Sequence, residues 1–301
     1  MKIRVSGKTD IGLERANNED YFSFCPDLTK RKWNYSSNEY VKIGRLGAIS
    51  IVADGMGGAN AGEIASTIAV ETIKGKLSRS ILLSSIDTEY KVRSCLLEFI
   101  KKANNAILKH IETDPDTIGM GTTIVILWIL HNKAFIAWCG DSRCYVFNPK
   151  YGLKCLTKDH SYVQELIDRG AMSVKESYKS PDNCIITRCI GDRDVSAEPE
   201  IVVYNIQRHD QFLLCSDGLS AYCKDNAIEH VYYNKYLNVT DCCNALVDLA
   251  IKSGGRDNIT VLCISTIDDD EVKIPFNLWN EITRQIKMLW FKLLNVWNLE
   301  V

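Results

Sequence analysis

The chain has 301 residues, which is long enough for one large domain or for two of ordinary size. Hydrophobic residues make up 46% of it and charged residues 25%, as in ordinary globular proteins. The formal net charge of -2 gives no electrostatic reason to expect nucleic acid as a main partner. The N-terminal residues lack the apolar core of a secretory signal, and no run of about 18 apolar residues predicts a membrane span. We therefore expect a cytoplasmic globular protein.

The twelve cysteines lie mostly within apolar segments, as in Leu213-Leu214-Cys215 and Val261-Leu262-Cys263. In a cytoplasmic protein such thiols are reduced, and a buried free cysteine behaves as a small hydrophobic residue. Cys242-Cys243 lacks the spacing of a zinc finger, and no Cys-x-x-Cys pair occurs. We expect neither a disulfide framework nor a structural zinc site.

A first strand is predicted over Ile3–Thr9, and a polar segment with Arg15, Glu19 and Asp20 follows it. An arginine suits bidentate phosphate binding, and an acid in the same segment suits a hard cation. The alternative is a solvated turn with a surface ion pair. Residues Pro26–Arg45 lack clear periodicity and are predicted to form a loop or an irregular hairpin.

The next apolar run, Ile49–Ala53, is rich in β-branched residues and predicts a buried strand. It ends in Asp54-Gly55-Met56-Gly57-Gly58. Glycine permits positive φ and close backbone approach, so Asp54 can share a cation or a phosphate with main-chain groups. Considered alone, the stretch fits an exposed turn equally well.

Two amphipathic helices, packed side by side, are predicted over Glu63–Lys76 and Tyr90–Ile111, since both show apolar residues at helical spacing. Three short β-rich runs then predict an antiparallel meander: Ile124–Leu130, Lys133–Cys139 and Cys144–Asn148. Asp141 lies between the second and third runs, where a hairpin turn explains it as well as a functional role does.

In the C-terminal half, Tyr162–Arg169 is predicted to be helical, with Asp159 or Ser161 as its cap and Gly170 at its end. Met172–Asn183 is predicted to be a surface loop. The remaining predicted elements are two strands (Ile201–Asn205 and one from Gln211), two helices (Asn226–Tyr233 and Val239–Lys252) and a last strand (Ile259–Ser265).

Acids recur at the ends of these strands. Asp54 and Asp217 each follow an apolar strand and precede a glycine, and Asp257 precedes the last strand. A turn explains each acid singly, but their recurrence favours one shared site at the mouth of a sheet sandwich. Several carboxylates at one place repel each other unless cations separate them. An all-oxygen ligand set favours Mg²⁺ or Mn²⁺ over Zn²⁺.

At this point the chain resembles a known family, the metal-dependent serine/threonine protein phosphatases (PPM, or protein phosphatase 2C type), and particularly its bacterial members. The matching motifs occur in the family's order and cover about residues 1–267. They are Arg15-Ala16-Asn17-Asn18-Glu19-Asp20, Val52-Ala53-Asp54-Gly55-Met56-Gly57-Gly58, Gly121-Thr122-Thr123, Cys139-Gly140-Asp141-Ser142-Arg143, Asp159-His160-Ser161, Thr187-Arg188-Cys189-Ile190-Gly191, Ser216-Asp217-Gly218-Leu219 and Gly255-Arg256-Asp257-Asn258-Ile259-Thr260.

The resemblance implies an α+β fold, an αββα sandwich of two antiparallel sheets flanked by helix pairs, over residues 1–267. It implies a centre of two Mn²⁺ or Mg²⁺ ions at one end of the sandwich. Asp54 would bridge the ions, and the Gly55 carbonyl would bind one of them. Asp217 and Asp257 would hold the other ion. The remaining acids, Asp20 and Glu19, would bind directly or through water, and Arg15 would clamp the phosphate.

The implied activity is hydrolysis of phosphoserine and phosphothreonine in proteins by a metal-activated water, opposing a serine/threonine kinase. We expect a monomer. One alternative is a catalytically weak member that binds or senses phosphoproteins, and another is an enzyme for small phosphorylated molecules. Met56 stands where some members carry a histidine that protonates the leaving alcohol, so the general acid is unassigned. Asp141 matches a ligand of a weaker third ion, but Ala221 stands where another ligand often lies, which puts that ion in doubt.

Residues 268–301 lie beyond the family core. Within them, Phe276–Trp297 predicts an amphipathic, mildly basic helix rich in tryptophan. Three roles are open for it: packing back on the domain, lying on a membrane surface so that the protein is peripheral to the membrane, or docking to a partner helix.

Overall fold

The computed structural model describes residues 1–267 except 37–38, 58–60, 80–85, 87, 178–179 and 235–236. Met1–Ile267 forms one compact unit. The predicted tail helix lies outside the described residues, so that helix and the domain boundary before it stay predictions. None of the described helices is long and apolar enough to cross a lipid bilayer.

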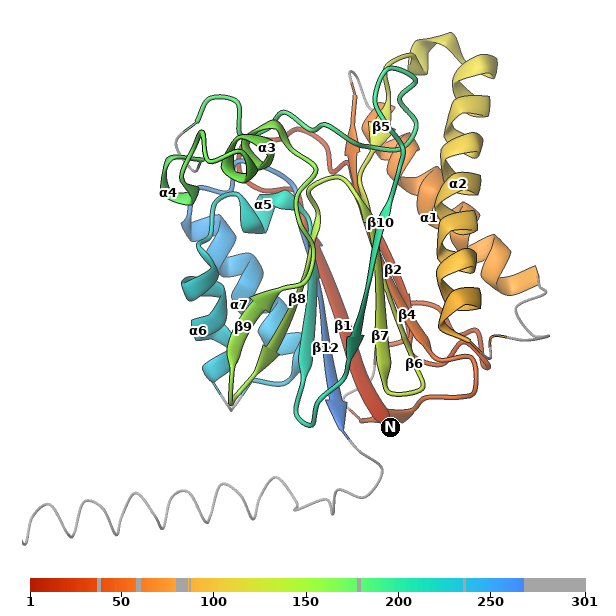
Figure 1. Cartoon of the computed structure of the whole chain (residues 1–301), viewed down its shortest axis with the longest axis vertical. Helices are drawn as coiled ribbons and strands as arrows, with labels where there is room; N and C mark the ends of the chain where they lie inside the picture. Colours follow the sequence, from red (N-terminus) through yellow and green to blue (C-terminus); the bar gives the residue numbers. More distant parts are fainter. Residues whose placement is uncertain are drawn as a thin grey trace, which may run out of the picture. The chain divides into compact units, whose positions relative to one another are not determined.

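Two antiparallel sheets pack face to face (Figure 1). The first sheet has the strand order β3-β1-β12-β11-β8-β9. Its strands are β1 (Lys2–Asp10), β3 (Val41–Lys42), β8 (Arg143–Asn148), β9 (Gly152–Cys155), β11 (Gln211–Cys215) and β12 (Ile259–Ile267). The second sheet has the order β10-β7-β6-β4-β2, and β5 pairs with β4 outside this path. Its strands are β2 (Asp20–Cys25), β4 (Ala48–Met56), β5 (Gly121–Thr122), β6 (Ile124–Leu130), β7 (Lys133–Cys139) and β10 (Glu200–Asn205).

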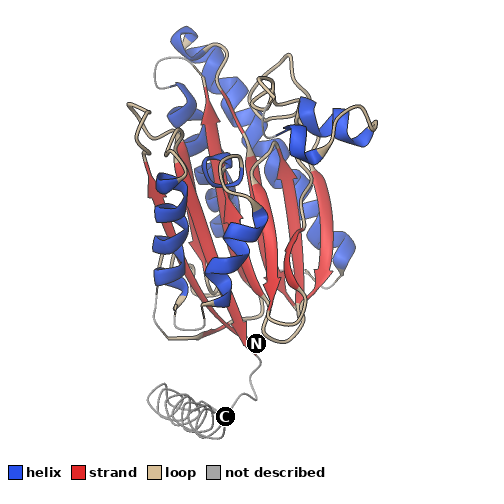
Figure 2. Ribbon diagram, turned by 90° about the vertical axis from the view of Figure 1, so that its left-hand side faces the viewer, coloured by secondary structure: helices blue, strands red, loops and turns tan. Residues whose placement is uncertain are grey.

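Helices cover the outer faces of both sheets. The long helices α1 (Ala61–Arg79) and α2 (Glu89–Thr113) pack side by side on the second sheet, and α6 (Asp225–Tyr233) and α7 (Val239–Lys252) pack on the first (Figures 1 and 2). The short elements are the 3-10 turn η2 (Pro115–Thr117) and the helices α3 (Tyr162–Asp168), α4 (Val174–Ser177) and α5 (Asp217–Ser220). The predicted αββα sandwich is therefore confirmed.

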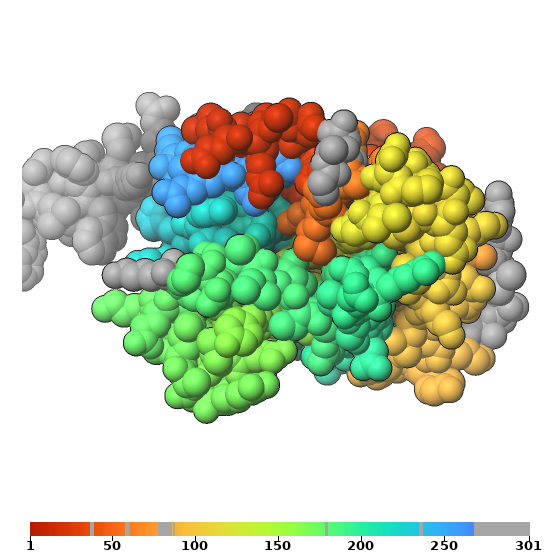
Figure 3. Space-filling view, turned by 90° about the horizontal axis from the view of Figure 1, so that it is seen from above, coloured from red at the N-terminus to blue at the C-terminus, as the bar shows by residue number. Residues whose placement is uncertain are grey.

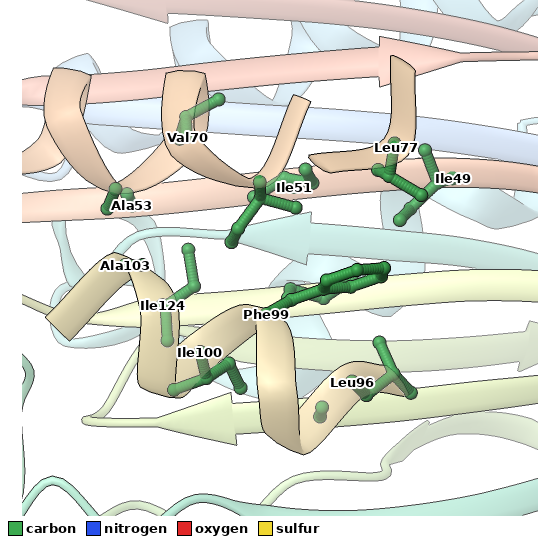
Figure 4. Close-up of a cluster of buried hydrophobic side chains, with 14 of the residues drawn as sticks. Ile49, Ile51, Ala53, Val70, Leu77, Leu96, Phe99, Ile100, Ala103 and Ile124 are labelled. Carbon is green, nitrogen blue, oxygen red and sulfur yellow. The ribbon is translucent and has the colours of Figure 1, made fainter. Parts of the chain in front are cut away.

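Strand pleating divides the interior into three apolar layers. In β6, Ile126 and Trp128 face α1 and α2, while Val125 and Leu127 face the other sheet. Figure 4 shows the layer between the second sheet and its two helices. Because both faces of β6 are buried, its sequence is a continuous apolar run instead of an alternating one.

These continuous apolar runs also explain why the third strand of the predicted meander is wrong. β6 and β7 pair as expected, but β8 lies in the first sheet, where it pairs with β9 and β11. The chain crosses between the sheets at Gly140, whose φ of +115° an L side chain rarely adopts. Strands buried on both faces carry no polar alternation, so their sequence does not indicate which sheet they join.

The region around α3 refines two other predictions. Ser161, and not Asp159, caps α3, since its Oγ accepts the Gln164 N–H at 3.4 Å. The predicted loop Met172–Asn183 contains α4. Ser173 and Glu176 exchange side-chain and main-chain hydrogen bonds there, which is a capping box that the Ser-x-x-Glu spacing encodes.

Replacing Trp128 is predicted to destabilise the fold strongly. This side chain is completely buried, donates its Nε1–H to the Leu46 carbonyl at 2.9 Å and stacks on Phe99. We expect Trp128→Ala to lower the unfolding free energy by about 3–5 kcal/mol, because it leaves a cavity in the layer under α2. The exposed Tyr90 of α2 gives the aromatic control, and Tyr90→Ala should change stability by no more than about 0.5 kcal/mol. Urea denaturation measures both, and equal effects would contradict the assigned packing.

Candidate active site

Both sheets contribute acids to the same end of the sandwich. Asp20 at the start of β2 pairs in register with Asp54 near the end of β4. In the first sheet, Asp217 follows β11 and Asp257 precedes β12, and these two strands are neighbours. Figure 3 looks onto this end, where the β1–β2 loop (red) faces the segment that contains α3 and α4 (green). The structure thus brings together the four aspartates that the sequence analysis grouped.

Two buried hydrogen bonds join the sheets near these acids. Ser216 donates its Oγ–H to Asp20 Oδ2 at 2.7 Å, which connects β11 with β2. Thr123 Oγ1 and Ser142 Oγ lie 2.7 Å apart, and Thr123 Oγ1 also accepts the Asp54 N–H at 3.1 Å. The Thr123 N–H in turn donates to the Asp54 carbonyl at 2.9 Å. The backbone of Asp54 is therefore fixed on both sides.

The glycines after two of the acids allow close backbone packing. A Cβ on Gly55 would overlap the Gly62 carbonyl, and a Cβ on Gly218 would overlap the Asn258 carbonyl. Any side chain at these positions would push apart the segments that carry the acids. This is a steric reason for the Asp-Gly pairs at residues 54–55 and 217–218.

Burial and mutual repulsion raise the pKa of the acids. Burial, with the charges of Asp217 and Asp257 adding to it, raises the pKa of Asp20 to about 7. Burial, with the charge of Asp257 adding to it, raises the pKa of Asp217 to about 6. Burial and the neighbouring acids hold the pKa of Asp54 well above its ordinary value. The protein spends free energy to keep these groups together, as binding sites for cations do.

The oxygen atoms at this end fit hard cations. Asp20 Oδ1 is buried and has no hydrogen-bond partner, so this oxygen is free to accept a cation. In the part of the chain that is described, no three His, Cys, Asp or Glu side chains form a ready-made ligand group. The donor set, all oxygen, suits Mg²⁺ or Mn²⁺.

Arg15 and Glu19 lie on the β1–β2 loop at the rim. Arg15 donates Nη2–H to Asp257 Oδ2 at 2.7 Å, and its side chain is 50% exposed. The main chain of Glu19 is held on both sides: its N–H donates to Asn258 Oδ1 at 2.8 Å, and its carbonyl accepts the Gly55 N–H at 3.1 Å. Burial raises the pKa of the Glu19 carboxyl. Both residues thus adjoin the four aspartates.

Asp141 lies in the crossover between β7 and β8. Its side chain is buried, and its Oδ1 has no hydrogen-bond partner. Burial and the charges of Asp217 and Asp159 hold its pKa well above the ordinary value. The hairpin-turn alternative is wrong, because β7 and β8 belong to different sheets.

Three polar residues that support the acids were not predicted from the sequence. Asn258 is one of them: its Nδ2 donates to the carbonyls of Ile11 and Asn17 at 3.0 and 2.9 Å, which anchors the β1–β2 loop. Ser216 and Thr123 are the others. Their only signal in the sequence is their position directly beside a strand-end acid or glycine, and many solvent-exposed turns share it.

Comparison with known proteins agrees with this geometry. The chain matches the model of the protein phosphatase 2C family over residues 45–259. It is 34% identical to protein phosphatase PhpP of Streptococcus pneumoniae, over 89% of this chain and 99% of that protein. It is 31% identical to serine/threonine protein phosphatase PstP of Mycobacterium tuberculosis, over 90% of this chain. The chain belongs to the protein phosphatase 2C family, as the motifs predict.

Solved structures show the same fold. The Streptococcus agalactiae serine/threonine phosphatase aligns with a TM-score of 0.75 and 30% identity, covering 88% of this chain and 100% of that one. The catalytic domain of PstP, solved with two manganese ions, aligns with a TM-score of 0.71 and 29% identity, covering 89% and 99%. The chain spans 46%, about half, of the full length of PstP.

The raised pKa values predict that the ion-free protein loses stability as the pH rises. Asp20 titrates at about 7 and Asp217 at about 6 in the folded chain, against an ordinary value of 3.8. The folded state holds protons that the unfolded state has released, so the stability these groups confer is full below about pH 4 and is lost by about pH 7. In EDTA, the urea-unfolding free energy should therefore fall between about pH 4 and pH 7.

The matched comparison uses two isosteric variants. Asp20→Asn removes one titrating group, so the fall in stability with pH should be smaller. Asp248→Asn removes an exposed acid on α7 and should leave the fall unchanged. An Asp20→Asn protein with the wild-type pH dependence would contradict the buried, protonated state of Asp20.

Proposed function

We propose that this chain is a metal-dependent protein serine/threonine phosphatase that hydrolyses phosphoserine and phosphothreonine in proteins. The observation that carries this proposal is the gathering of four aspartates, Asp20, Asp54, Asp217 and Asp257, from both sheets. Burial raises the pKa of the first three, and Arg15 pairs with Asp257. The relatives named serine/threonine phosphatases support it, and so does the PstP catalytic domain with its two manganese ions.

Two Mn²⁺ or Mg²⁺ ions fit the oxygen atoms of this centre. Asp54 is the proposed bridging ligand, with the Gly55 carbonyl beside it, and Asp217 and Asp257 are the ligands from the first sheet. Asp20 and Glu19 complete the set, directly or through water. Such ions, when bound, lower the pKa of a water so that it can attack phosphorus, and they neutralise charge on the phosphate oxygens. Asp141 matches a ligand of the weaker third ion of the family, but Ala221 offers no side-chain oxygen beside it, and the proposed centre therefore has two ions and not three.

Arg15 is proposed to hold the phosphate. Its guanidinium lies half-exposed against Asp257, and its Nη2 is 2.7 Å from Oδ2 of that acid. A planar guanidinium can bind two phosphate oxygens at once, and its charge opposes the negative charge that develops on the equatorial oxygens. The contact with Asp257 would orient the guanidinium before the substrate arrives.

The supporting polar residues are proposed to set the geometry. Ser216 donates to Asp20 Oδ2 and leaves the buried Oδ1 without a partner, and Thr123 fixes the backbone of Asp54. Met56 has no titrating proton, so the leaving alcohol is not protonated from that position. A catalytically weak phosphoprotein-binding member would have little use for so many costly buried acids, and we therefore favour the enzyme.

Its substrates are proposed to be phosphoproteins made by a serine/threonine kinase, and we expect the phosphatase to act as a cytoplasmic monomer. The alternative is that the enzyme acts on small phosphorylated molecules. Parallel assays with phosphopeptides and with small phosphate monoesters separate the two.

The metal centre predicts a sharp loss of activity when its bridging ligand is changed. Asp54→Asn keeps the shape but removes the negative charge that Asp54 offers to the two ions, and we expect phosphopeptide hydrolysis in Mn²⁺ to fall by at least about 100-fold. Asp248→Asn should retain full activity. Phosphate release from a phosphothreonine peptide, with and without EDTA, measures both effects. Activity that persists in EDTA, or an active Asp54→Asn enzyme, would refute the dinuclear centre.

The tail offers a separate prediction. If Phe276–Trp297 lies on membranes, deletion of residues 272–301 should abolish co-sedimentation with liposomes while leaving phosphopeptide hydrolysis intact. The amphipathic, mildly basic pattern is the reason, since such helices bind through their apolar face and their lysines. Equal sedimentation of the full and shortened chains would exclude the membrane role and leave the other two.

A further inference from the structure

A pocket of about 100 Å³ opens beside the acids. It lies between the β7–β8 crossover, the start of α5, and the helices α3 and α4. Asp217 lines it, so the pocket and the proposed metal centre share one wall. A substrate whose phosphate lies at the centre would therefore place a neighbouring side chain at the pocket mouth.

The charges in the pocket do not balance. Asp141, Asp159 and Asp217 line it, against the single guanidinium of Arg143. Arg143 is already paired with Asp159 through two hydrogen bonds, Nε to Oδ1 at 2.8 Å and Nη2 to Oδ2 at 2.6 Å. Asp217 belongs to the proposed ion-binding set. The carboxylate of Asp141 is thus left without a cation on this wall.

Asp141 is unusually poor in partners for a buried acid. The residue is only 7% exposed, and its Oδ1 has no hydrogen-bond partner. A buried carboxylate without compensation is costly, so the site gains free energy from any cation that reaches it. Ser220 also lines the pocket, is buried and offers a hydroxyl oxygen as a second acceptor.

A divalent ion fits this pocket less well than an organic cation does. Hard divalent cations take six or more oxygen ligands, and Ala221 contributes a methyl group where an oxygen would help. Farther out, Val163, Ile167 and Val174 form an apolar wall, and Val174 is 58% exposed and so lies toward solvent. An apolar wall that leads from solvent to a buried carboxylate matches a charged group on a methylene stem.

We propose that this pocket binds a lysine or arginine side chain of the phosphoprotein substrate, close in sequence to the phosphorylated residue, with its charge on Asp141. The stem lies along Val163, Ile167 and Val174, and the ammonium or guanidinium group donates to Asp141 and Ser220. The proposal rests on the proposed phosphatase function and adds to it a substrate class: phosphosites flanked by a basic residue.

The first test measures binding without turnover. A phosphothreonine peptide is made with a phosphonate that cannot be hydrolysed, and a single lysine is moved through the positions on either side. Norleucine, which has a similar stem without the charge, is the matched control at each position. Fluorescence anisotropy with the full chain and Mn²⁺ should show about tenfold tighter binding for lysine at one position, as expected for a hydrogen bond to a charged group.

The second test places a competing charge in the pocket. Gln164 on α3 lines the pocket but takes no part in the proposed chemistry. Gln164→Lys should remove the lysine preference and leave hydrolysis of p-nitrophenyl phosphate unchanged. Glu165→Gln, on the same helix but outside the pocket lining, makes the same change in charge and should keep the preference.

The two assays test the pocket proposal and the proposed phosphatase function separately. Absence of p-nitrophenyl phosphate hydrolysis would refute the phosphatase activity, while the anisotropy series would still decide whether the pocket selects a basic residue. Equal binding of lysine and norleucine at every position would overturn the proposal. So would a lysine preference that survives Gln164→Lys, or a third Mn²⁺ located at Asp141 by anomalous scattering.

Discussion

Repulsion among buried carboxylates is the constraint on which this structure depends. Asp20 and Asp54 come from one sheet and Asp217 from the segment after a strand of the other, and each has a raised pKa. Three apolar layers, one between the sheets and one under each helix pair, supply the packing that opposes this repulsion. The bond from Ser216 to Asp20 crosses between the sheets beside these acids. The sandwich acts as a rigid frame that holds like charges together.

Much of the fold follows from patterns that are local in the chain. Long amphipathic helices such as α2 show their apolar face in the spacing of their residues, and β4 and β6 are unmistakable apolar runs. The placement of β8 cannot be predicted from local patterns, since its sequence is compatible with either sheet and the turn at Gly140 looks like a hairpin. Elements of four residues, such as α4 and β9, bury too little for periodicity to reveal them.

Some residues of the site can also be predicted from local sequence patterns, and others cannot. Asp54, Asp217 and Asp257 are predictable because an acid after or before a buried strand, next to glycine or asparagine, recurs in one chain. Arg15 was predicted as a phosphate clamp, but its contact with Asp257 joins residues 242 positions apart and has no signature in sequence. Ser216, Thr123 and Asn258 were missed for the same reason. A hydroxyl or amide acquires its role only when folding brings it to an acid.

The pairing of β1 with β12 has a consequence for how the centre is assembled. Lys2 to Asp10 pair with Ile267 to Ile259 along their full length, and β12 also separates β1 from β11. β1 thus leaves the ribosome long before the strand with which it pairs, and contacts so distant in sequence form slowly. Asp257 and Asn258 are made just before that last strand. A nascent chain lacking them has neither an anchored β1–β2 loop nor a complete set of acids, so the proposed activity begins only once the whole domain has been synthesised.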